Sequence, residues 1–247
     1  KAVRATNIMG ASKRLAEICI QALYHQQKNH QKNNCNFAIV RFGNVLESSG
    51  SVIPKFKKQI SQGGPVTLTH PEVTRYFMTI TEASQLVIQA GAMSLGCEVF
   101  VLDMGESVKI RDLVYRMIKL SGLVIKNTEN LEGDIEVKII GLRPGEKLYE
   151  ELLLGDNPEK TYHEKIQKAH DPFIQLDQLK IHLDDLSILL EDNKADKVKE
   201  LLYKLVPSYK SNSKIVDHIY EEQLKLKKNN ESISAINNQE NNNFRIK

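Results

Sequence analysis

The sequence predicts an α/β protein in which at least some strands are parallel. Short apolar runs bounded by glycine turns alternate with amphipathic segments from Asn36 to about Leu154, and this alternation is typical of βαβ units. Beyond Asp171 the pattern is mostly helical, in "LDQLKIHLDDLSILLED" and "DKVKELLYKLVPSY". A chain of 247 residues is long enough for one large or two small domains.

At the start of the chain, apolar residues at helical spacing predict a long helix from Asn7 to roughly Gln27. The polar stretch "KNHQKNNCN" follows as a loop, and "FAIVRFGNV", from Phe37 to Val45, is a candidate buried strand ending in a glycine turn. The segment "SVIPKFKKQISQGG" predicts a short helix with Pro54 near its first turn and Gly63-Gly64 at its end.

The middle of the chain continues the alternation. A short strand "PVTLTH" precedes a helix that is expected to start at a Thr81 cap and to stop at Gly96. The strand "EVFVLDMG" and a helix ending at Gly122 come next. The stretch "DIEVKIIGLRPGEKLYEELL" then predicts a strand, a Pro-Gly turn and a helix. After about Lys227 the sequence is polar and Asn-rich, which predicts a disordered tail.

Composition limits the classes of function. The sequence is 41% hydrophobic and 26% charged, as is typical of soluble globular proteins, and its longest apolar runs are too short to span a bilayer. A net charge of +3 gives no argument for a nucleic-acid partner. The three cysteines have neither metal-ligand nor disulfide spacing, which fits a reducing, cytoplasmic setting.

The beginning of the sequence has no apolar signal segment. The first residue is Lys1 rather than methionine, and no glycine-rich phosphate loop is present. We therefore expect the chain to be a piece whose N-terminal part is missing.

The first candidate site is "NIMGASKRLAE", where Met9 and Lys13 lie four residues apart on one face of the predicted helix. A reactive side chain one turn before a lysine is a common catalytic arrangement, but methionine has no proton to give or take. Taken alone, the pair fits a packed helix with a lysine at its rim better than an active site.

Three further segments carry candidate binding residues. In "RFGNVLESSGSVIP", Asn44 follows a strand at the edge where ligands of open α/β sheets bind, although an ordinary connection explains it equally well. In "GLRPGEKLYEELL", the Arg143 side chain suits phosphate oxygens, and Glu146 could accept a hydrogen bond from a ribose hydroxyl. Alternatively, Arg143 and Glu146 pair with each other or flank a turn. In "THPEVTRYFMT", Arg75 binds an anion or anchors a loop, the second being slightly favoured.

The order of these motifs is more specific than any one of them. "KAVRATNIMGASKRLAE", "RFGNVLESSGSVIPKFKKQI", "THPEVTRYFMTI", "VFVLDMGESVKIRDL" and "GLRPGEKLYEELL" follow one another between Lys1 and about Ala169. In this order they closely resemble the polysaccharide-biosynthesis nucleotide-sugar 4,6-dehydratases and epimerases of the UDP-N-acetylglucosamine 4,6-dehydratase type. That family belongs to the extended short-chain dehydrogenase/reductases.

The resemblance implies a Rossmann domain that binds NADP or NAD and a smaller C-terminal α/β domain over a UDP-sugar substrate. The implied reaction converts a UDP-N-acetylhexosamine into a 4-keto-6-deoxy sugar nucleotide for surface polysaccharide, such as capsule or lipopolysaccharide. The cofactor takes a hydride from C4 of the sugar and returns it to C6 after water is eliminated across C5 and C6.

For catalysis, the resemblance places Met9 and Lys13 at the tyrosine and lysine of the family's Tyr-x-x-x-Lys motif. Methionine also stands there in the membrane-anchored branch of the family, so the substitution does not imply a dead enzyme, although Met9 cannot be the base. Lys1 matches the lysine of an Asp-Lys pair that serves as acid and base, and the aspartate would precede it. We therefore expect this chain alone to be inactive.

For binding, the resemblance implies roles for residues in four of these five motifs. Lys13 would hold the cofactor ribose, and Arg41 and Phe42 would lie beside the cofactor. The implied substrate-binding residues are Asn44 near the diphosphate, Val52 and Pro54 near the base, Arg75 and Arg143 on the phosphates, and Glu146 on the uridine ribose.

The expected organisation has three parts. Residues 1–170 would form the C-terminal part of the Rossmann domain interleaved with the sugar-nucleotide subdomain, residues 171–227 a helical extension, and residues 228–247 the tail.

The resemblance implies a homo-oligomer, and it leaves open a parent protein anchored at the cytoplasmic face of the inner membrane through the missing region. A catalytically incomplete UDP-sugar-binding fragment, or half of a split enzyme, is the alternative. We also expect low solubility, because a strand at Phe37–Arg41 would expose an edge.

Overall fold

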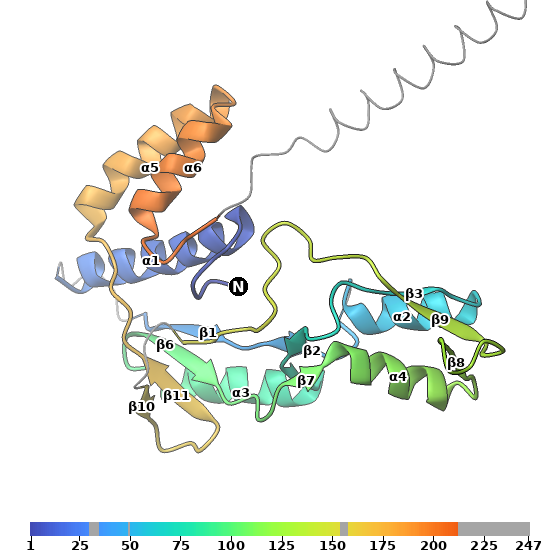
Figure 1. Ribbon diagram of the computed structural model, residues 1–247. Coiled ribbons are helices and arrows are strands. Elements are labelled where there is room, and N and C mark those ends of the chain that lie inside the picture. The colour runs from blue at the N-terminus through green and yellow to red at the C-terminus, as the bar shows by residue number, and fades with distance from the viewer. Residues whose placement is uncertain (30–34, 49, 154–157, 212–247) are drawn as a thin grey trace, which may run out of the picture. The chain divides into compact units, whose positions relative to one another are not determined.

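The structure is a computed structural model that describes residues 1–29, 35–48, 50–153 and 158–211 (Figure 1). The predicted tail and the end of the predicted helical extension lie outside these residues. Residues Lys1–Asn212 form one compact unit by their contacts. The α/β class is confirmed, because helices and strands alternate through most of this unit and strands pair in parallel.

The main sheet has four strands in the order β1-β6-β11-β10. Strand β1 (Phe37–Arg41) pairs in parallel with β6 (Cys97–Leu102), so that Phe37 lies opposite Cys97 and Arg41 opposite Val101. Strands β11 (Ile166–Ala169) and β10 (Glu159–Lys160) continue the sheet in antiparallel pairing. Among the described strands β1 has β6 as its single neighbour, so it lies at an edge of the sheet, as expected.

The strand predicted from Phe37 to Val45 is divided in two. After β1 the chain turns at Phe42-Gly43, and β2 (Asn44–Val45) pairs in parallel with β5 (Phe77–Met78) instead of continuing along β6. A Cβ at Gly43 would lie 2.9 Å from the Cβ of Tyr76, so glycine permits this close approach. The division places Asn44 beyond the end of the main sheet.

A second, three-stranded parallel sheet has the order β3-β9-β8. Its strands are β3 (Val66–Leu68), β9 (Ile135–Ile139) and β8 (Ile125–Lys126). Helices α2 (Val52–Ser61) and α4 (Ile110–Leu120) bury Phe56, Ile60, Val114 and Ile118 in one cluster with this sheet. The short strand β4 (Thr74–Arg75) pairs antiparallel with β7 (Val108–Lys109) beside it.

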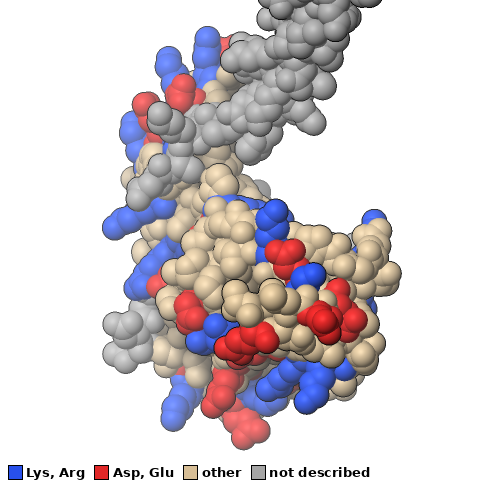
Figure 2. Space-filling view, turned by 45° about the vertical axis from the view of Figure 1, so that its right-hand side comes forward, with Lys and Arg blue, Asp and Glu red and all other residues tan. Residues whose placement is uncertain are grey.

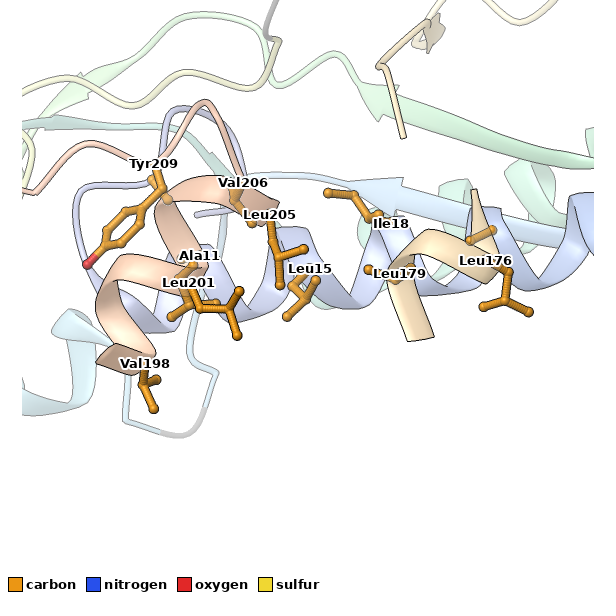
Figure 3. Close-up of a cluster of buried hydrophobic side chains, with 13 residues drawn as sticks. Ala11, Leu15, Ile18, Leu176, Leu179, Val198, Leu201, Leu205, Val206 and Tyr209 are labelled. Carbon is orange, nitrogen blue, oxygen red and sulfur yellow. The ribbon is translucent and has the colours of Figure 1, made fainter. Parts of the chain in front are cut away.

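Helix α1 (Ile8–Asn29) begins where the sequence predicts, because the Asn7 side chain accepts a hydrogen bond of 2.9 Å from the Gly10 N–H. Helices α5 (Leu176–Glu191) and α6 (Ala195–Leu205) pack against it. Figure 3 shows the cluster that they share, which includes Leu15 of α1, Leu179 of α5 and Leu205 of α6. The helical pattern beyond Asp171 therefore forms a core with the first helix of the chain.

Two predicted elements differ from the structure. The N-cap of helix α3 (Ile80–Met93) lies two residues before the predicted cap, because Thr79 rather than Thr81 accepts the Glu82 N–H, and the helix ends before Gly96. The helix predicted after Gly145 is absent from the described residues up to Leu153. There the Leu148 carbonyl accepts hydrogen bonds from the Thr74 N–H and from Arg75, which replaces helical bonding with contacts to β4.

Within the described ranges, no helix is long and apolar enough to cross a membrane. On the face shown in Figure 2, basic and acidic side chains are interspersed, without a large area of one sign.

Candidate functional site

A cavity of about 1040 Å³ is bounded by segments that are far apart in the sequence. Its walls come from the first residues and α1, from the chain between Ala38 and Val45, and from residues 143–152. The cavity therefore runs along β1 and past its carboxyl end, where ligands of open α/β sheets bind.

Most of the residues singled out in the sequence line this cavity. They are Lys1, Met9, Lys13, Arg41, Phe42, Asn44, Arg75, Arg143 and Glu146. Val52 lines an adjoining cavity of about 440 Å³, whose walls also include Lys1, Asn44, Arg75, Arg143 and Glu146. Pro54 lies within α2 and lines neither cavity. The structure thus brings the four motifs together, except for Pro54.

Glycine at position 10 allows the first residues to cross the start of α1. A Cβ at Gly10 would lie 2.6 Å from the Lys1 carbonyl oxygen and 3.0 Å from the Ala5 Cβ, distances at which a neighbour must move. The absence of a side chain at Gly10 lets Lys1 lie beside the helical turn that carries Met9 and Lys13. The spacing of motifs in the sequence did not indicate this contact.

Met9 and Lys13 face the cavity from α1. Met9 is 52% exposed, which argues against its being a core residue. Lys13 is exposed and makes no hydrogen bond or ion pair with any residue that the structure describes. Among the described residues, neither tyrosine nor histidine lines the cavity. Lysine and carboxylate side chains are the described groups of the cavity that suit proton transfer.

The turn after β9 is fixed by contacts to the first residues. Gly145 has a φ of +71°, and its carbonyl accepts hydrogen bonds from Thr6 Oγ1 at 2.6 Å and Asn7 Nδ2 at 3.3 Å. Lys147 donates to the Val3 carbonyl at 3.0 Å, and Arg4 pairs with Glu151 at 2.6 Å. These contacts hold residues 143–151 against the start of α1.

Glu146 closes this turn instead of starting a helix. Its Oε2 accepts the Arg143 N–H at 3.1 Å, while its Oε1 accepts the Thr69 hydroxyl at 2.9 Å. The Glu146 N–H also donates to the Arg143 carbonyl at 2.9 Å. Arg143 and Glu146 thus flank a turn, as one interpretation of the sequence expected, and both still face the cavity.

Arg75 is surrounded by partners. Its Nη1 donates to the Thr74 and Leu148 carbonyls at 2.7 and 3.2 Å, and its guanidinium lies 3.5 Å from both Glu146 and Glu150. The Glu150 carboxylate also accepts from Asn44 Nδ2 at 3.4 Å. Sequence reasoning missed Glu150, although it follows Glu146 by four residues in the same motif.

A buried ion network of Arg14, Glu17, Arg41 and Asp171 lies at the wall of the cavity, which Glu17 and Arg41 line. Arg41 Nε donates to Glu17 at 3.0 Å, Arg14 Nη1 donates to Glu17 at 2.9 Å, and Arg41 also pairs with Asp171. Burial would lower the pKa of the Arg41 guanidinium, but the hydrogen bonds and charges of Glu17 and Asp171 raise it above its ordinary value.

This network changes the interpretation of Arg41. Its side chain is 6% exposed, and its Nε and Nη2 are directed at carboxylates, whereas its buried Nη1 has no hydrogen-bond partner among the described residues. The expected place of Arg41 beside the cofactor stays a prediction. Glu17 and Asp171 were not singled out in the sequence. Glu17 follows Lys13 by four residues on α1, so helical spacing could have indicated that Glu17 shares its face.

A nicotinamide cofactor, which the resemblance implies, fits one wall of the cavity. There α1 presents the apolar side chains of Met9, Ala16 and Ile20 together with the ammonium of Lys13, which has no partner among the described residues. An apolar surface beside a single donor suits a nicotinamide ring and the hydroxyls of its ribose. Lys13 is the residue that would hold that ribose. No group of His, Cys, Asp and Glu in the described part of the chain could hold a metal ion.

Comparisons with known proteins show which family this chain matches. Residues 1–171 match the family described as polysaccharide biosynthesis protein. The capsular polysaccharide biosynthesis protein CapD of Staphylococcus aureus is 49% identical over 207 residues, which are 83% of this chain and 31% of CapD. The inverting UDP-N-acetylglucosamine 4,6-dehydratase of Campylobacter jejuni strain 81-176 is 31% identical over 81% of this chain and 54% of that enzyme.

A solved structure also matches. The X-ray structure of Pen from Bacillus thuringiensis has a TM-score of 0.52 and 38% sequence identity, and the match covers 61% of this chain and 44% of that chain. The chain thus spans between about a third and about a half of the length of these relatives.

Proposed function

Because the chain belongs to the family of polysaccharide biosynthesis proteins, we propose that it forms the sugar-nucleotide-binding part of a nucleotide-sugar dehydratase. The substrate would be a UDP-N-acetylhexosamine and the product a 4-keto-6-deoxy sugar nucleotide. Bound NADP or NAD would supply the hydride chemistry, removing hydrogen from C4 of the sugar and returning it to C6.

One observation carries this proposal: a single cavity is lined by Lys13 from α1, Asn44 from β2 and Arg143 from the turn after β9. The cavity is large enough for a drug-sized ligand and joins a second cavity at Asn44 and Arg143. A sugar nucleotide has two bulky ends joined by a diphosphate. Two connected cavities with an arginine at their junction match that shape.

Each of these cavity residues has a role in the proposed reaction that follows from the chemistry of its side chain. Arg143 is exposed and suits the diphosphate, because its planar fork can bind two phosphate oxygens. Lys13 donates to hydroxyl oxygens, and Met9 provides apolar contact beside it. Lys1, which lies near them because Gly10 has no side chain, exchanges a proton with the sugar during the elimination of water.

UDP binding tests the proposal. Isothermal titration calorimetry of the chain should detect UDP, and Arg143→Ala should weaken binding about tenfold or more, as expected for loss of a charge-assisted contact. Arg116→Ala, an exposed arginine of α4 outside both cavities, is the matched control and should leave the affinity unchanged. Absence of UDP binding, or equal affinities in all three proteins, would refute the proposal.

Product analysis separates the candidate activities. Incubation with UDP-N-acetylglucosamine and NADP⁺ or NAD⁺ yields a 4-keto-6-deoxy sugar nucleotide from a dehydratase and a sugar epimer from an epimerase. This chain alone is expected to bind UDP and to form neither product, as a binding fragment or half of a split enzyme also would, and turnover by the chain alone would contradict that expectation. Adding a separate dinucleotide-binding chain would restore activity only in the split enzyme.

A further inference from the structure

Residues 1–7 belong to neither a helix nor a strand, and their main chain is held by residues far along the sequence. The Val3 carbonyl accepts a hydrogen bond from Lys147 Nζ at 3.0 Å, and the Ala5 carbonyl accepts the Lys210 N–H at 2.9 Å. Val3 and Ala5 are 2% and 1% exposed. Buried carbonyls without partners in a helix or sheet need partners elsewhere, so the position of this segment depends on these two contacts.

Lys147 has two partners at this contact. Besides the Val3 carbonyl, its Nζ lies 3.2 Å from Glu151 Oε2, and Glu151 Oε1 in turn lies 2.6 Å from Arg4 Nη1. Arg4 has a φ of +41°, in the left-handed region that non-glycine residues seldom adopt. Lys147 and Glu151 therefore hold residues 1–7 at two neighbouring positions, one of them in an unfavourable backbone conformation.

The contacts from Lys147 through Glu151 to Arg4 are ionic. Burial would raise the pKa of the Glu151 carboxyl, but the hydrogen bonds and charges of Arg4 and Lys147 lower it below its ordinary value. The ionised carboxylate is thus shared by one cation from residues 1–7 and one from the turn after β9. Replacing it with a neutral amide would weaken both contacts.

The same turn faces the cavities on its other side. Glu146, directly before Lys147, lines both cavities and accepts hydrogen bonds from Thr69 and from the Arg143 N–H. The Arg143 side chain also lines both cavities. The turn thus contacts the candidate nucleotide site through Arg143 and Glu146, and residues 1–7 through Lys147. A ligand that fixes the turn therefore also restricts residues 1–7.

Lys147 itself lines the larger cavity, so direct contact with a ligand is the competing role. Its side chain is 24% exposed, and the Val3 carbonyl and Glu151 occupy two of its three ammonium hydrogens. Turning Lys147 toward a ligand would leave the buried Val3 carbonyl without this partner, which is costly. The contacts therefore favour a role in holding residues 1–7.

We propose that Lys147 is a positioning residue that transmits binding at the nucleotide site to residues 1–7 and so fixes the place of Lys1 beside the sugar. The proposal rests on the proposed function for the identity of the ligand and for proton transfer by Lys1. The nucleotide does not react, so its binding energy is available to orient the group that does. Such coupling is reciprocal, so loosening residues 1–7 also weakens nucleotide binding.

NMR of isotope-labelled alanine methyl groups tests the coupling through Ala5. Ala5 is 1% exposed and lines neither cavity, so a shift of its signal does not come from direct contact with the ligand. Saturating UDP should shift this signal in the unsubstituted chain. In Lys147→Met the shift should be lost while UDP still binds, about fivefold more weakly. Lys147→Arg, which keeps a charged donor, should restore most of the shift.

Glu151→Gln separates positioning from direct binding and is a milder substitution than Lys147→Met. If Lys147 bound the ligand directly, removing the neighbouring negative charge would strengthen UDP binding or leave it unchanged. Positioning predicts instead that UDP binds more weakly and that the UDP-induced shift of the Ala5 signal is reduced.

Two controls accompany these variants. Lys138→Met replaces an exposed lysine of β9 outside both cavities and should retain the full Ala5 shift. The methyl signal of Ala90, which is buried in α3, should be the same in all variants. A general loss of structure would instead change the Ala90 signal as well.

Two results would overturn the proposal: a UDP-induced Ala5 shift that persists in Lys147→Met, or no such shift in an unsubstituted chain that binds UDP. Failure of the proposed function has a different signature, because the unsubstituted chain then shows no UDP binding in calorimetry. The ligand-free spectra decide the positioning role in that case. Lys147→Met should move the Ala5 signal without ligand, and an unmoved signal would exclude the role.

Discussion

Lys13 and Arg14 are neighbours in the sequence and lie in opposite environments. Arg14 is 2% exposed and donates to Glu17 and to the Pro172 carbonyl. Lys13 lines the open cavity and has no partner among the described residues. A buried charge needs partners because desolvation is costly, whereas a partnerless charge is tolerated where water or a ligand reaches it.

The same contrast separates the buried ion network from the cavity rim. Within the network, two arginines and two carboxylates neutralise one another. At the rim, Lys13 and Arg143 have charges that nothing in the described structure offsets. Charges of the first kind stabilise the arrangement of α1, β1 and the chain before α5, and charges of the second kind are available for binding.

The largest effect is expected where the network loses one charge. Arg41→Met should lower the free energy of unfolding by about 3–5 kcal/mol, because Glu17 and Asp171 would then share Arg14 alone in a buried site. Urea denaturation measures the loss. The same substitution at Lys13 is the matched control and should leave the midpoint almost unchanged. Equal denaturation midpoints for Arg41→Met and Lys13→Met would mean that the buried network charges contribute no more to stability than the charges at the cavity rim.

A second variant in the same background sharpens the test. Adding Glu17→Gln to Arg41→Met removes the excess negative charge and should recover part of the lost stability. Further destabilisation on adding Glu17→Gln would show that packing, rather than charge balance, determines the stability of the network.

An intermediate effect is expected at Gly145, where the rim meets the first residues. An alanine Cβ there would lie 2.9 Å from the Asn7 Cβ and 3.0 Å from the Thr6 carbonyl oxygen. Gly145→Ala should therefore cost about 2–4 kcal/mol from overpacking together with backbone strain. Gly105 has a similar φ, +65° against +71°, but nothing within 4 Å of its Cβ position.

Gly105→Ala is thus the control for Gly145→Ala. It should cost only the strain, about 1 kcal/mol. The difference between the two variants in thermal denaturation isolates the contact between the Gly145 turn and the first residues. Equal losses in the two variants would mean that this contact contributes nothing to stability.

The smallest effect is expected at Glu98, whose side chain is neither as buried as the ion network nor as exposed as the charges at the cavity rim. Burial would raise the pKa of the Glu98 carboxyl, but hydrogen bonds from Ser94 Oγ at 2.8 Å and the Gly96 N–H at 2.9 Å lower it below 4.5. The folded state thus favours the ionised form. Its stabilisation is fully present above pH 4.5 and is lost as the pH falls through the lowered pKa.

Glu98→Gln should therefore reduce stability by about 1 kcal/mol at pH 7. The difference from the unsubstituted chain should shrink below about pH 4, where the carboxyl becomes protonated. Denaturation at a series of pH values measures it. A difference that stays constant down to about pH 3 would exclude the ionised carboxylate as its cause.

Local sequence patterns predicted most helices and strands well, because periodicity and caps act over a few residues. The long helix α1 and the pair α5 and α6 are examples. The helix predicted after Gly145 failed for a tertiary reason. Its carbonyls and carboxylates bind β4, Thr69 and the first residues, and these long-range bonds outweigh the helical propensity of "GEKLYEELL".

The candidate site could be predicted as a set of residues but not as a set of partners. Motif order identified Lys13, Asn44 and Arg143, and all three line one cavity. Nothing local indicated that Arg75 would bind Glu150, or that Arg41 would bind Glu17 and Asp171, since these partners are 24 to 130 residues away in the sequence. The ligand contacts of each residue stay predictions.

The bond between Thr6 and Gly145 joins positions 139 residues apart. Closing so long a loop costs chain entropy, roughly 2 kcal/mol more than closing one of about ten residues. Folding that follows local contacts first would complete α1, α5 and α6 early and this closure late. During refolding, the far-ultraviolet signal of the helices should therefore recover before affinity for a nucleotide does.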